Sequence, residues 1–360
     1  MHHRSSSKPL ALFSLFIAII VFGVFATGSH AGADESTEKT GRPNILFIMS
    51  DDHTANAFGC FGSRFASINP TPNIDRLAAQ GMILKNVFCT NSICSPSRAS
   101  IFSGQYSHKN GVRHLNESID PKAPNLATLL GASGYNTAIV GKWHLTVDPP
   151  GFDHWIVLPG QGRYNNPQFL TPDGMKTIEG HSTDVITDLA IDWLKNGRDG
   201  DKPFFLMCHF KAAHEAWQYA DRYADLYEDV EFPEPPSLFE DQSHRSAATR
   251  DLGYTMETLA PRMQKKGHVP EQFKPDPSLS AEEKRRATYQ HFMKAYFRTV
   301  KGIDDNVGRL TEFLHENGLD DNTLVVYTSD QGYFLGEHNY IDKRWMFEES
   351  LRMPMVVRYP

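Results

Sequence analysis

The sequence predicts an α/β fold with a mostly parallel central sheet flanked by helices. Short apolar runs alternate with amphipathic segments of helical period, and this unit occurs four times between residues 44 and 329. The apolar runs are nearly continuous, as in parallel strands that are covered on both faces. Each run is followed by polar residues, which sets the expected position of a functional site.

The first strand and helix show the pattern most clearly. Residues 44–50, NILFIMS, form an apolar run that stops at Asp51 and Asp52. Residues 71–81, TPNIDRLAAQG, then supply an N-cap, a proline at the first helical position and a terminating glycine. We therefore expect a buried strand followed by a helix.

Three further units continue the alternation. In chain order, they are a helix and a strand within residues 125–144, a helix at 182–196 with a strand at 203–210, and a helix at 296–318 with a strand at 323–329. The polar residues that follow these strands are Lys142 and His144, then His214, then Asp330 and Gln331. Ligands of open α/β sheets bind beyond the carboxyl ends of the strands, so we expect these side chains to converge.

The N-terminal residues predict export. Arg4 and Lys8 precede an apolar run at residues 10–25, which is typical of a secretory signal peptide. We assign residues 1–31 to the signal and 32–42 to a linker, and expect a periplasmic or secreted protein, with a membrane anchor only if the signal is not cleaved. The formal net charge of -7 argues against binding nucleic acid through the overall field.

Two features stand outside the alternation. The segment 217–290 is rich in charge and proline and predicts an inserted substrate-side segment, or equally a solvated excursion, with a helix beginning near Ser280. The four cysteines are too few and scattered for a disulfide scaffold or a zinc site, and a disulfide among Cys60, Cys89 and Cys208 cannot be assigned.

The carboxylates of Asp51, Asp52 and Asp330 and the amide oxygen of Gln331 form a set of oxygen donors. Such donors suit a hard divalent cation, and we favour Ca²⁺ over Mg²⁺. An Asp-Asp pair after a strand is by itself more often a turn or a helix cap. The second pair in the same topological position reverses that preference.

The stretch TNSICSPSRAS, residues 90–100, places a cysteine in a polar turn. Pro96 is well placed to begin a helix, which would put Cys94 at or just before its N-terminus. The helix dipole and the guanidinium of Arg98 would there stabilise an anion. A lone cysteine is usually a small buried hydrophobe, but the polar setting weakens that interpretation.

These residues resemble a known family. CSPSRASIFSG, residues 94–104, is similar to the signature of the type I sulfatases, C-x-P-S-R followed by four residues and T-G, with Ser103 in place of the threonine. GKWH, SDQG and IDKR then follow in the family's order. The resemblance runs from about residue 42 to residue 360, and we assign residues 43–360 to a sulfatase catalytic domain. It implies an alkaline phosphatase-like sandwich. Members of the family usually continue into a smaller C-terminal subdomain, so we expect that the chain is truncated at Pro360.

The resemblance also implies roles for the matching residues. A formylglycine-generating or anaerobic sulfatase-maturating enzyme would oxidise Cys94 to Cα-formylglycine, which would complete a calcium site with the four oxygen donors. The implied catalytic and sulfate-binding residues are Cys94, Arg98, Lys142, His144, His214 and Lys343. One hydroxyl of the aldehyde hydrate would attack sulfur and form a covalent sulfo-enzyme, with Asp330 as base. His214 or Lys343 would protonate the departing alcohol, and His144 would assist release of sulfate.

The chain most resembles bacterial sulfatases that act on the 6-O-sulfate of N-acetylglucosamine in heparan-type glycosaminoglycans. Sugar contacts are expected from His338, Asp342, Arg344 and Trp345. Ala213 and Ala216 stand where the family commonly has prolines, which makes the placement of His214 the least firm. Two alternatives remain: a phosphodiester or phosphonate hydrolase of the same superfamily, and an inactive module that binds sulfated glycan.

Overall fold

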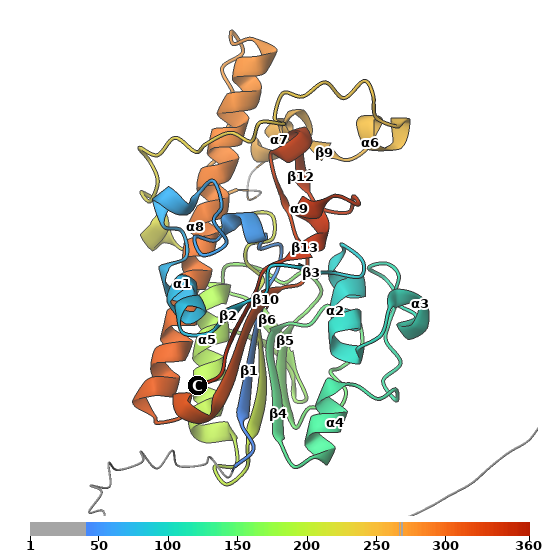
Figure 1. Cartoon of the computed structure of the whole chain (residues 1–360), viewed down its shortest axis with the longest axis vertical. Helices are drawn as coiled ribbons and strands as arrows, with labels where there is room; N and C mark the ends of the chain where they lie inside the picture. Colours follow the sequence, from blue (N-terminus) through green and yellow to red (C-terminus); the bar gives the residue numbers. More distant parts are fainter. Residues whose placement is uncertain (1–40, 266, 268) are drawn as a thin grey trace, which may run out of the picture. The chain divides into compact units, whose positions relative to one another are not determined.

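A computed structural model describes residues 41–360 except 266 and 268. The predicted signal peptide therefore lies outside the described residues, as does all of the linker except residues 41 and 42. In the described part, the main sheet has nine strands in the order β2-β14-β10-β1-β8-β4-β5-β6-β7 (Figure 1). The mostly parallel sheet predicted from the sequence is confirmed.

The five central strands run parallel to one another. They are β10 (Thr323–Ser329), β1 (Asn44–Ser50), β8 (Phe204–His209), β4 (Asn136–Lys142) and β5 (His154–Leu158). Antiparallel strands extend both edges: β14 (Met355–Arg358) and β2 (Met82–Ile83) on one side, β6 (Gln168–Thr171) and β7 (Gly174–Thr177) on the other.

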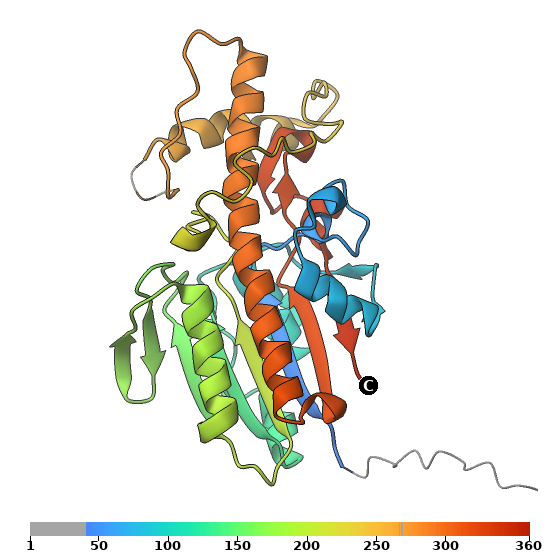
Figure 2. The same ribbon diagram turned by 90° about the vertical axis from the view of Figure 1, so that its left-hand side faces the viewer.

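Helices cover both faces of the sheet (Figures 1 and 2). One face carries α1 (Pro72–Ala79), α5 (Ser182–Asp192) and α8 (Ala281–Glu316), and the other carries α2 (Cys94–Ser103) and α4 (Leu126–Ala132). The smaller helices are α3 (Ser107–Asn110), α6 (Ala247–Asp251), α7 (Met256–Met263) and α9 (Glu348–Leu351).

Strand β1 shows why the sheet needs both layers. Leu46 and Ile48 are fully buried in the core beneath α1, α5 and α8, whereas Ile45 and Phe47 pack into the core beneath α2 and α4. Successive side chains of a strand point to opposite faces, so a continuous apolar run has to be covered twice. The NILFIMS run therefore requires a sheet covered by helices on both faces rather than a sheet with one solvent-exposed face.

The register of the parallel strands aligns their carboxyl ends. Ser50 of β1 lies opposite Ser329 of β10, and His209 of β8 lies opposite Gly141 of β4. Gly141 has a φ of +101°, and a Cβ atom there would lie 2.0 Å from the carbonyl oxygen of His209. Only glycine fits this close approach, which sets the position of the residue that follows, Lys142.

The structure corrects the helix expected at 296–318. Together with the helix predicted near Ser280, it forms one continuous helix, α8, which begins after a capping box between Ser280 and Glu283. The last residues of the 217–290 segment are thus the first turns of α8. No helix in the described residues is long and apolar enough to cross a membrane.

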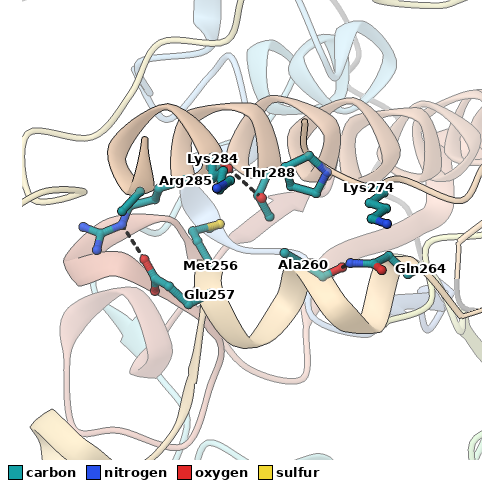
Figure 3. Close-up of a pocket in the computed structure, with 10 residues that line it drawn as sticks. Met256, Glu257, Ala260, Gln264, Lys274, Lys284, Arg285 and Thr288 are labelled. Carbon is teal, nitrogen blue, oxygen red and sulfur yellow. Dashed lines mark hydrogen bonds and ion pairs between the residues drawn. The ribbon is translucent and has the colours of Figure 1, made fainter. Parts of the chain in front are cut away.

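The 217–290 segment also reaches the main body through a small sheet. Its strand β9 (Tyr254–Thr255) pairs with β12 (Tyr340–Asp342), which pairs in turn with β11 (Phe334–Leu335). A separate pair joins β3 (Val87–Phe88) to β13 (Arg352–Met353). Helix α7 packs against the first turns of α8 around a cavity of about 340 Å³ (Figure 3).

Candidate active site

Charged side chains gather where the parallel strands end. Asp51 and Asp52 follow β1, Asp330 and Gln331 follow β10, and all four are buried. Carboxylate oxygens of the three aspartates lie within 4.8 Å of one another. The backbone N–H of Asp52 also donates to Asp330 Oδ1 at 3.2 Å. The convergence predicted from the strand ends is confirmed.

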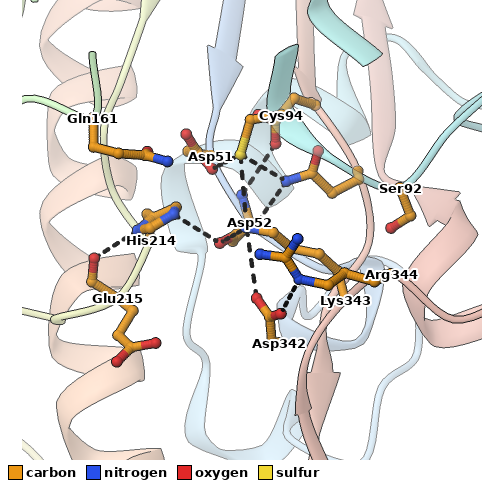
Figure 4. Close-up of polar contacts among 12 residues, drawn as sticks. Asp51, Asp52, Ser92, Cys94, Gln161, His214, Glu215, Asp342, Lys343 and Arg344 are labelled. Carbon is orange, nitrogen blue, oxygen red and sulfur yellow. Dashed lines mark hydrogen bonds and ion pairs between the residues drawn. The ribbon is translucent and has the colours of Figure 1, made fainter. Parts of the chain in front are cut away.

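Three buried cations face these carboxylates, and Figure 4 shows one of them, Lys343, beside Asp52. Arg98 Nε donates to Asp330 Oδ2 at 2.9 Å, and Lys343 Nζ donates to both carboxylate oxygens of Asp52, at 2.6 and 2.5 Å. Lys142 forms an ion pair with Asp51. Breaking one buried pair leaves an uncompensated charge, so these groups depend on one another.

Cys94 is the first residue of helix α2, as the position of Pro96 predicted. Its Sγ lies 3.4 Å from Asp51 Oδ1 and 3.6 Å from both Gln331 Nε2 and Lys343 Nζ. Burial and the nearby Asp51 raise the pKa of the thiol to about 12. Cys94 is therefore a buried thiol with polar and charged neighbours, which is not the environment of a packed hydrophobe. All four cysteines are free thiols.

We use the name edge cluster for the residues joined by these contacts: Asp51, Asp52, Cys94, Arg98, Lys142, Asp330, Gln331 and Lys343. Burial raises the pKa of Asp52 to about 7, against the attraction of Lys343. Burial alone would also raise the pKa of Asp51, but Lys142 and the other nearby cations lower it well below its usual value. The edge cluster thus holds charges of both signs in a water-poor site.

The donor atoms of the edge cluster fit a hard divalent cation. They are the clustered carboxylates and Gln331 Oε1, which is buried and has no hydrogen-bond partner among the described residues. A buried acceptor without a partner is costly, and a cation would satisfy it. Because Arg98, Lys142 and Lys343 already match the three carboxylates in charge, a divalent ion would make the site net positive. Such a site suits an anionic ligand.

Two histidines flank the edge cluster. His214 Nε2 lies 3.9 Å from Asp52 Oδ2, and burial, with Lys343 nearby, lowers the pKa of His214 well below its usual value. His144 follows β4 with a φ of +60°, and its buried Nδ1 has no partner in the described part of the chain. Burial, with Lys142 nearby, lowers the pKa of His144 to about 3. Burial therefore disfavours the charged form of both imidazoles.

The predicted sugar contacts separate into two groups. Asp342 and Arg344 flank Lys343, and Arg344 Nε donates to Asp342 Oδ2 at 2.8 Å (Figure 4). The side chain of Arg344 is 44% exposed, so its guanidinium is accessible from solvent. His338 instead contacts Glu240 and Arg245 of the 217–290 segment, and Trp345 stacks on Tyr340. The structure brings Asp342 and Arg344 to the edge cluster but shows no such contact for His338 or Trp345 within the described residues.

Sequence reasoning missed several residues that surround the edge cluster. Gln161 accepts a hydrogen bond from Lys142 Nζ at 2.6 Å, and the Tyr164 hydroxyl donates to the His214 carbonyl. Lys211 is buried with its amine 4.8 Å from the Tyr164 ring centroid, and burial lowers the pKa of Lys211 to about 7. The signal for Gln161 and Tyr164 is the run HWIVL before them, which is strand β5 and was not predicted.

Comparison with known proteins gives a consistent result. The family model described as Sulfatase matches residues 43–360. The N-acetylglucosamine-6-O-sulfatase of Bacteroides thetaiotaomicron is 40% identical over 99% of this chain and 70% of its own length. The sulfatase YidJ of Escherichia coli (strain K12) is 25% identical over 89% of this chain, which spans 63% of that relative.

A solved structure supports the same relationship. It is described as a complex with the substrate D-glucosamine-2-N,6-O-disulfate and matches with a TM-score of 0.83 and 38% identity. The match covers 89% of this chain and 72% of the other. Sequence signature, fold and site geometry therefore agree, and the chain belongs to the sulfatase family, a family of sulfuric ester hydrolases.

Proposed function

We propose that this protein is an exported sulfatase that hydrolyses the 6-O-sulfate of glucosamine residues in heparan-type glycosaminoglycans. The observation that carries the proposal is the position of Cys94 at the start of α2, in contact with Asp51, Gln331 and Lys343. One relative is named an N-acetylglucosamine-6-O-sulfatase and one solved structure is a complex with D-glucosamine-2-N,6-O-disulfate, which supports the sugar. Export rests on the predicted signal at residues 1–31.

The cations of the edge cluster account for sulfate binding. A sulfate ester is an anion, and negative charge develops on the leaving oxygen as the S–O bond breaks. Lys343 and Lys142 are buried and held in place by Asp52 and Asp51, so they need no reorganisation to stabilise that charge. Arg98 holds Asp330 and so orients that carboxylate.

The nucleophile in this proposal is a Cα-formylglycine made from Cys94 by a maturating enzyme. The hydrated aldehyde supplies two hydroxyl groups, one to accept the sulfuryl group and one to release it. Asp330, which faces the start of α2, is the candidate base. Lys343 and His214 are the candidate proton donors to the leaving alcohol, because both lie beside Asp52.

A divalent metal ion, which we propose to be Ca²⁺, fits the same donors. Asp51, Asp52, Asp330 and the unpartnered oxygen of Gln331 would hold it. Bound there, the ion would supply charge stabilisation for the sulfate oxygens. The protein's part is to keep these oxygen donors fixed at the strand ends.

Sugar recognition is assigned to the residues beside Lys343. Asp342 and Arg344 offer an acceptor and a fork of donors, the usual partners of sugar hydroxyls. They lie next to the proposed sulfate site, so they would contact the ring that carries the sulfate. Asp342 and Arg344 both have positive φ, 73° and 91°, which is a strained backbone common at ligand sites.

The test combines a mass measurement on the peptide that contains Cys94 with an assay of substrate turnover. The protein is co-expressed with a maturating enzyme, and the tryptic peptide of residues 86–98 is weighed for conversion of the thiol to an aldehyde. Glucosamine sulfated at the 6-O, 3-O or 2-N position is then offered, together with an aryl phosphodiester. Turnover of the 6-O-sulfate alone is expected. An intact thiol in a folded, active protein contradicts the formylglycine mechanism, and preferred turnover of the phosphodiester contradicts the sulfatase assignment.

A further inference from the structure

The loop that carries His214 is held in place without proline. Asp51 donates its backbone N–H to the Ala212 carbonyl at 2.9 Å, and the Tyr164 hydroxyl donates to the His214 carbonyl. Trp217 at the end of the loop is fully buried. Contacts from other elements therefore take the place of the chain stiffness that prolines would have provided.

The orientation of the His214 ring depends on the next residue. His214 Nδ1 lies 2.6 Å from the carbonyl oxygen of Glu215. A carbonyl oxygen only accepts, so Nδ1 carries a proton, and Nε2 is the nitrogen that faces Asp52 and can exchange a proton there (Figure 4). Movement of the Glu215 peptide would therefore turn the imidazole away from the site.

An arginine of the 217–290 segment holds Glu215. Arg262 of α7 forms an ion pair with the Glu215 carboxylate, and the two side chains are 24% and 15% exposed. The guanidinium of Arg262 also lies over the ring of Tyr254, 4.4 Å from its centroid. Arg262 is thus fixed on one side by a carboxylate and on the other by an aromatic face.

Tyr254 links Arg262 to the segment that carries Lys343. It belongs to β9 and pairs with Ile341 of β12, directly before Asp342 and Lys343. Arg262 therefore bridges the loop of His214 and the strand that leads to Lys343. These are the two candidate proton donors of the proposed reaction.

We propose that Arg262 is a positioning residue for catalysis, which acts through Glu215 to hold His214 Nε2 toward the substrate. The inference rests on the proposed sulfatase function and extends it to the 217–290 segment. Arg262 does not touch the edge cluster in any contact of the described residues. Because Arg262 acts on the placement of His214, loss of Arg262 should lower kcat and leave KM nearly unchanged.

The experiment uses two variants that break the same ion pair from either side. Arg262→Met keeps an unbranched apolar stem over Tyr254, and Glu215→Gln keeps the backbone carbonyl that His214 needs. In the mature, metal-loaded enzyme, each should lower kcat for the 6-O-sulfate on the order of 10- to 100-fold, because small misplacements of a catalytic group are that costly. KM should stay within about two-fold of wild type, and Arg262→Lys should restore most of the rate.

Arg285→Met is the matched control. Arg285 also belongs to the 217–290 segment, pairs with Glu257 of α7 at 2.6 Å and lies over the Phe239 ring at 5.1 Å (Figure 3). The Arg285→Met substitution removes an ion pair and a cation–π contact, as Arg262→Met does, but at a place that does not contact the His214 loop in the described part of the chain. Its kcat should match wild type.

A double variant separates positioning from general destabilisation. If Arg262 acts through His214, Arg262→Met should slow the His214→Ala enzyme by less than about two-fold, since the coupled residue is already gone. Losses that multiply, or a raised KM with unchanged kcat, overturn the proposal.

Hydrogen exchange provides a readout that needs no activity. Amides of residues 211–217 should exchange faster in Arg262→Met than in wild type or Arg285→Met, while those of β8 stay protected. Unchanged exchange in this loop overturns the inference. Failure of the wild-type protein to hydrolyse sulfate esters would refute the proposed function. The exchange experiment would still test whether Arg262 holds the loop of His214.

Discussion

The edge cluster and the 217–290 segment hold charges in opposite ways. In the edge cluster, Arg98 and Lys343 are at most 2% exposed in their side chains, and their partners come from other strands and loops. In the 217–290 segment, pairs such as Arg250 with Asp251 are about half exposed and local in sequence. The contrast indicates that the sheet edge positions groups for chemistry, whereas most charges of the segment only keep it solvated.

A mostly buried pair at the site departs from this division. Arg262 and Glu215 join the 217–290 segment to a loop of the site and are mostly buried. This mostly buried contact to a loop of the site differs from the many exposed charges of the segment. The predictions below test whether the two regions differ as sharply as their burial implies.

The largest expected effect is at Cys94. Cys94→Ser should lower sulfate ester turnover by on the order of 10³-fold or more, because a serine cannot supply the second hydroxyl group of an aldehyde hydrate. Stability should change little, since the Sγ contacts are 3.4 to 3.6 Å long. The assay compares initial rates and thermal unfolding. Retained turnover in the variant would show that residue 94 is not the nucleophile. A wild type that turns over no sulfate ester but binds sulfated glycan as well as the variant does would favour the inactive binding module.

Next in size is the stability of the buried pairs. Lys343→Met should lower the free energy of unfolding by about 3–5 kcal/mol in EDTA, because Asp52 is left buried with its main partner removed. Lys202→Met is the control, since the side chains of Lys202 and Asp199 are 56% and 45% exposed and the loss of their pair should change stability little. Urea titration measures both. Equal losses would mean that the edge cluster is no more interdependent than the surface.

Metal binding should stabilise the edge cluster by an intermediate amount. Ca²⁺ at about a hundred times its Kd should raise the free energy of unfolding by about 2.7 kcal/mol. Asp330→Asn should remove most of that rise, whereas Asp241→Asn, a change of an exposed carboxylate in the 217–290 segment, should not. Unfolding curves with Ca²⁺ and with EDTA give the difference. A rise that survives Asp330→Asn would place the ion elsewhere.

The smallest effect is expected within the 217–290 segment. Arg286 pairs with Glu234 at 3.1 Å, and their side chains are 46% and 28% exposed. Arg286→Ala should leave stability and kcat nearly unchanged, because water replaces such a pair at little cost. Chemical unfolding and a rate measurement suffice. A large loss in either would show that exposed pairs of the segment also support the site.

Most of the fold and much of the edge cluster could be predicted from local patterns. The strand ends at Asp51, Lys142 and Asp330 are visible because a buried strand is an uninterrupted apolar run and polar residues mark its end. Gln161 and Tyr164 were missed, since the short strand β5 before them was not recognised. The continuity of α8 was also missed, because the polar sequence of its first turns hides the helical period.

The sequence by itself determined the fold class, the side of the sheet on which polar groups meet and the unusual setting of Cys94. These follow from short-range periodicity and from the signature at residues 94–104. Only the tertiary structure decided which charges pair, how His214 is oriented and that Arg262 reaches Glu215. The physical reason is that strand order and loop packing bring together residues that lie far apart in the chain. Local sequence patterns contain no information about such long-range contacts.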